Sequence, residues 1–228
     1  MIRCKPIKRT LIGGFLIFIQ ILALGSIYDT SVVQSSRFST KTPLMAFDDP
    51  VYLVGNDSID LFCAGNGTTG ESWESAHRIE NLTIDGFEGV GVFIANTTTH
   101  LILRNLTIFN CSTAISIQNC TNIRIQNCTL NDSISAIDLN LVESCIISNN
   151  TLYSNDYGIR ATADLTFALI ENNSIYLNQY GIYIWGVSSQ IDINSNDFQE
   201  NQYCIDIQTG FNSITISNND LFLRDIWI

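Results

Sequence analysis

The sequence predicts an all-β fold, a parallel β-helix of about seven coils with three short strands in each coil. Apolar and polar residues alternate in short bursts, as at Ile182 and Ile184, which is typical of strands with one buried face. A fixed repeat of this kind indicates stacked coils, whereas a helical solenoid would show apolar residues at three-to-four spacing. The repeat is 22 to 24 residues long and carries an apolar anchor at Ile84, Ile108, Leu130, Leu152, Ile175, Phe198 and Leu221.

A polar residue stands three positions before each anchor, and this column predicts a ladder of side-chain hydrogen bonds. Asparagine tolerates the left-handed backbone of a tight turn, and its amide both donates and accepts, so equivalent amides in successive coils can bond. The next column, from Leu82 to Asn219, has mixed polarity and is assigned to a less constrained turn position. Tyr157, Tyr180 and Tyr203 are predicted to stack at a corner. The predicted ladder residues are Asn81, Asn105, Asn127, Asn149, Asn172, Ser195 and Asn218.

The N-terminal segment predicts export. Four basic residues among the first ten precede an apolar run at 11–27, which is the pattern of a secretory signal at the lower length limit of a membrane span. Residues 1–27 are therefore interpreted as a cleaved signal peptide or a retained hydrophobic signal/anchor helix, and the rest of the chain is expected outside the cytoplasm. Residues 28–47 are predicted to be a flexible linker, 48–80 a cap region and 81–228 the repeats.

Charge narrows the classes of partner. From Asp48 onward the chain has 21 acidic and five basic residues. A surface of this kind repels phosphate backbones, so nucleic acid is not an expected partner. The sequence stops at Ile226-Trp227-Ile228, in the first strand of another coil. An open last coil exposes a strand edge and the core. We therefore expect either that a partner covers the C-terminal coil or that the repeat domain is truncated and a missing segment would cover it.

One outward column carries the candidate catalytic residues. Asp138 precedes Arg160, with Tyr183 in the coil beyond, and successive members would lie about 4.8 Å apart. This arrangement either binds an acidic or neutral sugar or forms a cross-strand ion pair on a solvated face. Sugar cleavage needs two acids at a controlled separation, and a single column offers no tight Asp cluster. The candidates are Asp138, Arg160, Tyr183 and Asp206, and the prediction leans against an enzyme.

The metal candidates are Cys111, Cys120 and Cys128. They are close in sequence but lie at different points around the coil, with no C-x-x-C pair and no histidine at ligand spacing. Cys145 aligns with inward aliphatic positions and is expected in the core. His77 and His100 have no evident partner, which favours a structural or surface role. No cofactor is predicted, and copper or calcium are secondary options.

Three segments near the start of the repeats resemble the NosD-like proteins with right-handed parallel β-helix repeats: VYLVGNDSIDLF (51–62), GNGTTGESWESAHRIENLTIDG (65–86) and GVFIANTTTHLILRNLTIFN (91–110). The resemblance covers nearly everything after residue 50 and implies the right-handed fold. Named members are described as periplasmic copper-binding proteins, a role that needs Cys, Met or His ligands. The wider superfamily includes pectate lyases, polygalacturonases and alginate epimerases, whose Gly-His-Gly and Arg-x-Lys motifs are missing from residues 48–228.

The sequence therefore predicts an exported β-helix protein at the cell surface, in a periplasm-like space or outside the cell. We expect it to bind polysaccharide or another surface protein, or to serve a structural role there. Membrane contact would come only through residues 11–27, if they are uncleaved. The alternatives are a carbohydrate-active lyase, hydrolase or epimerase, and a NosD-like protein of copper-enzyme maturation.

Overall fold

The computed structural model describes residues 2–3, 47–208 and 210–222. The predicted signal or anchor, the linker and the C-terminal residues from 223 onward therefore lie outside the described residues, apart from Phe47 and the two-residue strand β1 (Ile2–Arg3), which pairs antiparallel with β18. The helix α1 has eight residues, and no helix in the described ranges has the length and apolar character of a membrane span.

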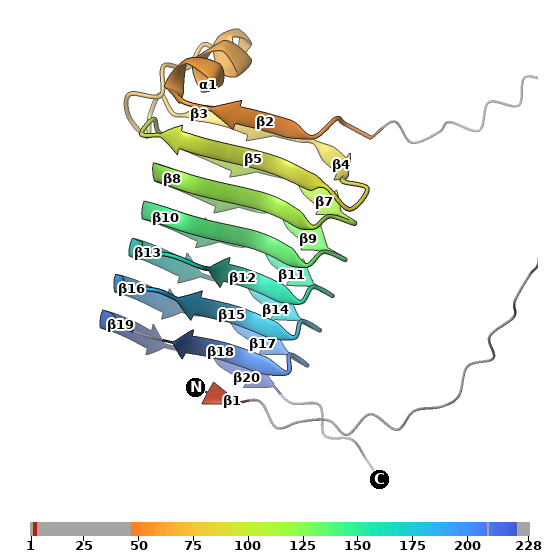
Figure 1. Cartoon of the computed structure of the whole chain (residues 1–228), viewed down its shortest axis with the longest axis vertical. Helices are drawn as coiled ribbons and strands as arrows, with labels where there is room; N and C mark the ends of the chain where they lie inside the picture. Colours follow the sequence, from red (N-terminus) through yellow and green to blue (C-terminus); the bar gives the residue numbers. More distant parts are fainter. Residues whose placement is uncertain (1, 4–46, 209, 223–228) are drawn as a thin grey trace, which may run out of the picture. The chain divides into compact units, whose positions relative to one another are not determined.

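The chain from residue 51 onward winds into a parallel β-solenoid, as predicted (Figure 1). Strands β5 to β20 form six coils, and β2 to β4, interrupted by the cap, form another at the N-terminal end. Most coils have three strands, but in β8 and β10 the first two run on as one. The strands are β2 (Val51–Val54), β3 (His77–Glu80), β4 (Thr83–Asp85), β5 (Val90–Thr97), β6 (Leu101–Arg104), β7 (Thr107–Phe109), β8 (Thr113–Gln126), β9 (Thr129–Asn131), β10 (Ser135–Ser148), β11 (Thr151–Tyr153), β12 (Tyr157–Ala161), β13 (Leu165–Glu171), β14 (Ser174–Tyr176), β15 (Tyr180–Trp185), β16 (Ser188–Asn194), β17 (Asp197–Gln199), β18 (Tyr203–Gln208), β19 (Phe211–Ser217) and β20 (Asp220–Phe222).

Equivalent strands of successive coils pair in register and form three faces. The first face contains β2, β5, β12, β15, β18 and the N-terminal parts of β8 and β10, and the second contains β3, β6, β13, β16, β19 and the C-terminal parts of β8 and β10. The third face is a separate seven-stranded sheet, β4-β7-β9-β11-β14-β17-β20, and each of its strands carries one predicted anchor. Phe198, for example, pairs with Ile175 and is fully buried. β-Branched residues suit this interior because they pack well on a pleated surface.

The asparagine ladder exists, but the prediction placed it one residue too early. From Asn150 onward the stacked amides occupy the column of mixed polarity: the backbone N–H and Nδ2 of Asn150 both donate to Asn173 Oδ1, at 2.9 and 3.0 Å. The same bonds link Asn173 to Asn196 and Asn196 to Asn219. Each Nδ2 also donates to a backbone carbonyl, such as that of Ile125. These bonds satisfy amides that lie inside the coil.

The predicted column instead supplies the corner of each coil. All its members have positive φ, from 53° to 61°, so the expected left-handed backbone is confirmed. Their side chains are exposed, because in this conformation the corner residue points outward and the next residue turns inward. Within the described part of the chain, Asn105 is the one member whose side chain donates to its predicted neighbour, Asn81, at 3.2 Å. The residues that were predicted to form the ladder and instead occupy the corners are Asn81, Asn105, Asn127, Asn149, Asn172, Ser195 and Asn218.

A second buried amide ladder runs along another corner and was not predicted. Asn155 donates through its backbone N–H and Nδ2 to Asn178 Oδ1, and Asn178 donates in the same way to Asn201. Towards the N-terminus the column continues as Ser133 and Cys111, linked by single hydrogen bonds. Two parallel ladders therefore fix the register of the coils at two corners.

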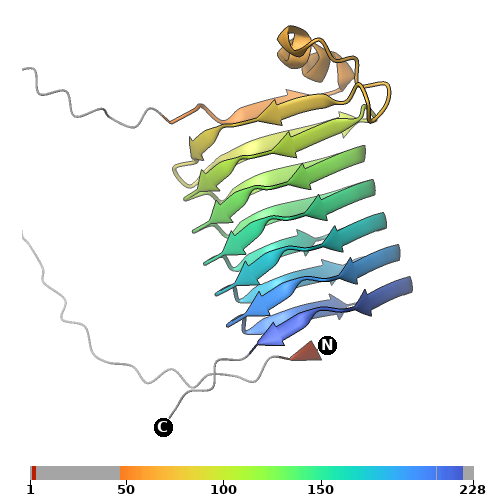
Figure 2. The same ribbon diagram turned by 180° about the vertical axis from the view of Figure 1, so that it is seen from behind.

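A short cap covers the N-terminal end of the solenoid (Figure 2). Helix α1 (Asn56–Cys63) follows Gly55 and is succeeded by the 3₁₀ turn η1 (Ala64–Asn66), which ends at the left-handed Gly67. Such glycines end helices because they adopt positive φ without a Cβ clash. Ile59 and Cys63 are fully buried and belong to the solenoid core. The predicted cap region thus closes the apolar interior at this end.

Candidate functional site

The candidate site lies on the outer surface of the first face, at strands β10, β12, β15 and β18. Asp138 pairs with Arg160, Arg160 with Tyr183 and Tyr183 with Asp206, so the predicted column is one continuous row across four coils. We call this surface the Tyr face. It has three neighbouring columns. The first is Ser135, Tyr157, Tyr180 and Tyr203; the second is Asp138, Arg160, Tyr183 and Asp206; the third is Asn140, Thr162, Trp185 and Gln208.

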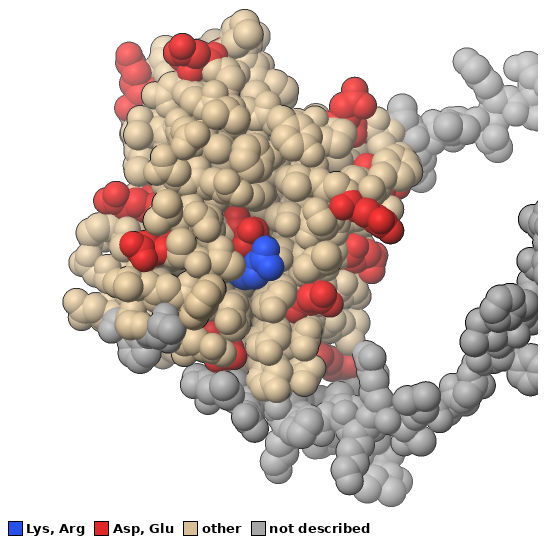
Figure 3. Space-filling view, viewed as in Figure 1, with Lys and Arg blue, Asp and Glu red and all other residues tan. Residues whose placement is uncertain are grey.

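The charged pair on the Tyr face is well formed. Arg160 Nε donates to Asp138 Oδ1 at 2.8 Å, and this hydrogen bond raises the pKa of Arg160. The guanidinium carbon also lies 5.2 Å from the ring centroid of Tyr157. The side chains are only 27% and 15% exposed, so water screens the pair less than it screens an exposed ion pair. In Figure 3 the basic atoms visible on this side lie beside an acidic group.

The predicted tyrosine column is confirmed as a continuous stack. The rings of Tyr157 and Tyr180 are 5.1 Å apart at 10°, and those of Tyr180 and Tyr203 are 4.8 Å apart at 16°. The ring of Tyr183 lies 5.5 Å from that of Tyr157 in a tilted arrangement and 5.4 Å from that of Tyr180 in a T-shaped one. Burial raises the pKa values of Tyr180 and Tyr183, with smaller contributions from neighbouring tyrosines and Asp206. These phenols therefore stay neutral and can donate hydrogen bonds at physiological pH.

The two carboxylates of the column are too far apart to cleave a glycosidic bond together. Asp138 and Asp206 are three coils apart, which corresponds to about 14 Å, whereas glycosidase pairs lie within about 9.5 Å. Asp206 is only 2% exposed; its Oδ2 accepts from Gln208 Nε2 at 3.1 Å, and its Oδ1 has no hydrogen-bond partner within the described part of the chain. The column is thus suited to contact rather than to general acid–base hydrolysis.

Trp185 is a residue of this face that the sequence reasoning missed. It lies two positions after Tyr183 on β15, and alternate residues of a strand point to the same side. Half of its surface is exposed, although it directly follows the buried Ile184. The alternation that identified Tyr183 would also have identified Trp185, had it been continued to the end of the strand.

The structure does not bring the three candidate metal ligands together. Each thiol donates to the carbonyl two residues earlier, at 3.3 Å for Cys111, 3.1 Å for Cys120 and 3.4 Å for Cys128. Burial raises the pKa of each, that of Cys128 to about 11, which disfavours the metal-binding thiolate. Across the described residues no three His, Cys, Asp or Glu side chains are arranged to hold a metal ion.

We expect the buried thiols to be inert to alkylation in the native protein. Burial raises the pKa of Cys145 to about 12 and that of Cys128 to about 11, so almost no thiolate forms at mildly alkaline pH. Iodoacetamide labelling followed by peptide mass spectrometry should modify both residues only after unfolding in guanidinium. Rapid labelling of either one in the folded protein would contradict the packing described above.

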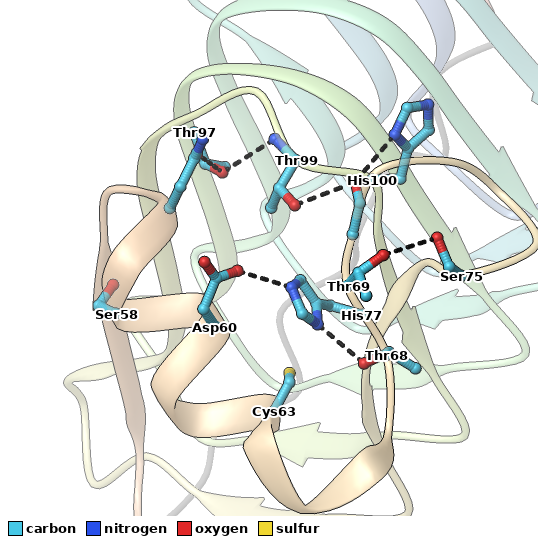
Figure 4. Close-up of polar contacts among 12 residues, drawn as sticks. Ser58, Asp60, Cys63, Thr68, Thr69, Ser75, His77, Thr97, Thr99 and His100 are labelled. Carbon is cyan, nitrogen blue, oxygen red and sulfur yellow. Dashed lines mark hydrogen bonds and ion pairs between the residues drawn. The ribbon is translucent and has the colours of Figure 1, made fainter.

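The cap contains a second polar cluster, centred on His77 (Figure 4). Its Nε2 bonds to Asp60 Oδ1 and its Nδ1 to Thr68 Oγ1, both at 2.8 Å. His77 therefore has two partners that were not evident in the sequence, and its buried position agrees with the predicted structural role. Its side chain occupies an inward column position, paired with the buried Leu101 in the next coil. Alignment of His77 with Leu101 in the repeat would have identified His77 as an inward-facing residue.

The His77 cluster joins a hydroxyl, an imidazole and a carboxylate in the order used by nucleophilic enzymes. The imidazole is only 1% exposed, however, so a substrate has no access to it. His100 also has partners: its backbone N–H and Nδ1 both approach Gly70 O, at 2.9 and 3.1 Å, and its ring meets Trp73 edge-on. We interpret both histidines as structural residues that fasten the cap loop.

Comparison with known proteins agrees with this architecture. The fold and its stacked outer face define a right-handed β-helix repeat protein. The sequence matches the family described as "Right handed beta helix region" over residues 68–221, and the chain belongs to that family. The NosD-like subdivision stays a prediction. No curated protein matches the sequence.

Several solved structures are similar to this chain at low sequence identity. The enzymatically active domain of bacteriophage CBA120 tailspike protein 2 has 15% identity and a TM-score of 0.51, over 64% of this chain and 24% of the tailspike chain. The chain thus spans about a quarter of that protein. Endopolygalacturonase I from Stereum purpureum has 13% identity and a TM-score of 0.36, over 78% and 79% of the two chains. The mannuronan C-5 epimerase A-module of Azotobacter vinelandii has 7% identity and a TM-score of 0.28, over 66% and 77%.

Proposed function

We propose that this protein is exported and binds an extended polysaccharide along the Tyr face. The observation that carries the proposal is the tyrosine stack beside the Asp138–Arg160 pair, a partly exposed surface that the core does not require. Neutral phenols and a fixed ion pair supply hydrogen-bond donors and acceptors for sugar hydroxyls. Successive coils repeat these groups about every 4.8 Å, close to the length of one pyranose unit in an extended chain.

Binding is preferred to catalysis because of the spacing of the acids. The Asp138 carboxylate is engaged by Arg160, and Asp206 lies about 14 Å away along the coil axis. An extended polymer, by contrast, can contact groups on several coils at once, and contacts linked along one chain raise the overall affinity. The predicted basic-then-apolar N-terminus supports export to the cell surface, where polysaccharides are abundant.

Affinity electrophoresis of the full chain in gels that contain individual plant, microbial or algal polysaccharides tests this function. We expect retardation by at least one polymer, and at least tenfold weaker binding by Tyr180→Ala, which removes the middle ring of the stack. Circular dichroism should confirm that the variant is folded. Tyr176→Ala is the matched control, because Tyr176 stacks on Tyr153 at 5.0 Å on the third face.

Two results would contradict the proposal. If no polysaccharide retards the protein while a pull-down recovers a protein ligand whose binding depends on Tyr180, the face binds protein instead. If the protein releases reducing ends or unsaturated sugars from a polymer, and Asp138→Ala abolishes that release without unfolding, the face belongs to a carbohydrate-active enzyme.

A further inference from the structure

We infer that the Tyr face selects uncharged polysaccharides, with a sugar ring stacked on Trp185, and rejects polyuronates. This inference rests on the proposed function and names its ligand class. The charge balance of the face and one exposed indole support it, and the indole was not needed to propose binding itself.

Within residues 47–222, as far as the structure describes them, the Tyr face offers no free cation; Arg3, which pairs with Tyr203 through β1, belongs to the segment predicted to be a cleaved signal or an anchor. Within the described part of 47–222, Arg160 is the one basic residue that projects from the first face; Arg78, Arg104 and Arg124 lie on strands of the second. Arg160 is already paired with Asp138. A sugar carboxylate would have to displace Asp138, and a partly buried carboxylate would be left without its partner. Specificity through such a penalty is common at interfaces.

The remaining charge on this side of the molecule is negative. Asp206 adds a second carboxylate to the same row; it is buried at 2% exposure, so it acts on a polymer at a distance and not by contact. Acidic side chains also surround this side of the molecule in the space-filling view of Figure 3. The whole chain has a formal net charge of −11. Like charges on the protein and the polymer slow the encounter with a polyanion and weaken its binding.

Trp185 supplies an apolar platform in a neutral setting. Its 50% exposed indole is a flat apolar surface, and such surfaces pack against the C–H face of an uncharged sugar ring. Its neighbours along the coils carry neutral polar groups. Gln208 pairs with it in register, and Thr162 lies one coil before it, since the adjacent Ala161 pairs with Ile184.

The polar residues around Trp185 suit sugar hydroxyls. Asn140 Nδ2 donates to Thr162 Oγ1 at 3.3 Å, which orients both groups at the edge of the face. The remaining amide oxygen of Asn140 and the amide of Gln208 provide both acceptors and donors. An apolar platform bordered by a few neutral polar groups is typical of sites for neutral ligands that present both apolar and hydroxyl surface.

The test compares neutral and acidic polymers on the intact chain. Affinity electrophoresis with β-glucan, mannan and xyloglucan as neutral probes, and with polygalacturonate and alginate as acidic probes, should show retardation by a neutral polymer only. Trp185→Ala should weaken that binding at least tenfold. Phe62→Ala is the matched control, because Phe62 is an aromatic residue of similar exposure, 48%, on the cap helix, and it should bind like the unaltered protein.

A gain of function tests the role of charge separately. Asp138→Ser places at this position the residue that the preceding coil carries, Ser116, and releases Arg160. We expect this variant to bind polygalacturonate at least tenfold more tightly than the unaltered protein, with an affinity that falls as salt is added. No gain would contradict the role of Asp138 in rejecting uronates.

The outcomes separate the inference from the proposed function. Tighter binding of polygalacturonate or alginate than of every neutral polymer would overturn the inference while leaving polysaccharide binding in place. If Trp185→Ala binds the neutral polymer as tightly as the unaltered protein, the proposed stacking of a sugar ring on Trp185 is wrong. Failure of all five polymers to bind would overturn the inference, and the proposed function too if the wider panel also fails.

Discussion

Replacement of Asn173 by alanine should lower the free energy of unfolding by about 2 to 6 kcal/mol. Asn173 is 1% exposed and is the middle member of the first buried ladder. Its Oδ1 accepts from the backbone N–H and Nδ2 of Asn150, and its Nδ2 donates to Ile147 O at 2.9 Å. Without the amide, the N–H of Asn150 and the carbonyl of Ile147 are left buried without these partners, and each such group costs about 1 to 3 kcal/mol.

Urea unfolding followed by circular dichroism measures this loss. Asn172→Gly is the control, because Asn172 is exposed, has φ of 55° and belongs to the column first predicted to stack. Glycine accepts positive φ readily, so the control should change stability by less than about 1 kcal/mol. Equal losses in the two variants would contradict the assignment of the ladder to Asn173 rather than Asn172.

Replacement of Gly70 by alanine should detach the cap loop. Gly70 has φ of 68°, and a Cβ there would overlap Thr99 Oγ1 and lie 2.6 Å from His77 Cδ2. Its carbonyl also accepts from His100 N and Thr99 Oγ1, at 2.9 and 3.2 Å. Relief of the overlap must move the loop and break these bonds, so beyond the cost of a left-handed alanine we expect a loss of about 3 kcal/mol, the upper range for overpacking.

Gly67→Ala isolates that effect. Gly67 has nearly the same φ, 65°, but a Cβ there would meet nothing within 4 Å. The free energy of unfolding of Gly67→Ala should therefore fall only by the cost of placing an alanine in the left-handed conformation, about 1 to 2 kcal/mol. Hydrogen exchange should show faster exchange at the His77 and His100 amides in Gly70→Ala, since these donate to His100 O and Gly70 O. Equal stability of the two variants would mean that the loop is not held through Gly70.

The repeat predicted the solenoid well because each coil must place the same apolar residues inside at the same register. Periodicity alone does not say which of two adjacent corner residues turns inward. The left-handed backbone at Asn149 and Asn172 points those side chains to solvent, so the ladder passes through Asn150 and Asn173. The left-handed backbone was predicted correctly, and the error lay in the direction of the side chain.

The His77 cluster was missed for a different reason. The cap interrupts the first coil between β2 and β3, so the period that aligns later coils does not reach the partners of His77, Asp60 and Thr68. Their proximity depends on how the cap loop returns to the sheet. The Tyr face, by contrast, lies wholly within the regular coils, and its row from Asp138 to Asp206 could be predicted from spacing alone.

The two amide ladders have a consequence for the evolution of length. Each link between two asparagines joins a residue to its counterpart 23 residues later, as in Asn150 to Asn173 and Asn155 to Asn178, and the link from Ser133 to Asn155 spans 22. Duplication or loss of a whole unit would therefore leave the hydrogen bonds of both amide ladders continuous. Insertion of one residue within a strand would instead turn the buried side chains of that strand outward. Selection can thus lengthen or shorten the chain in steps of one coil. Each step would add or remove one row of the Tyr face, so under the proposed function the number of repeats would set the length of polymer that is bound.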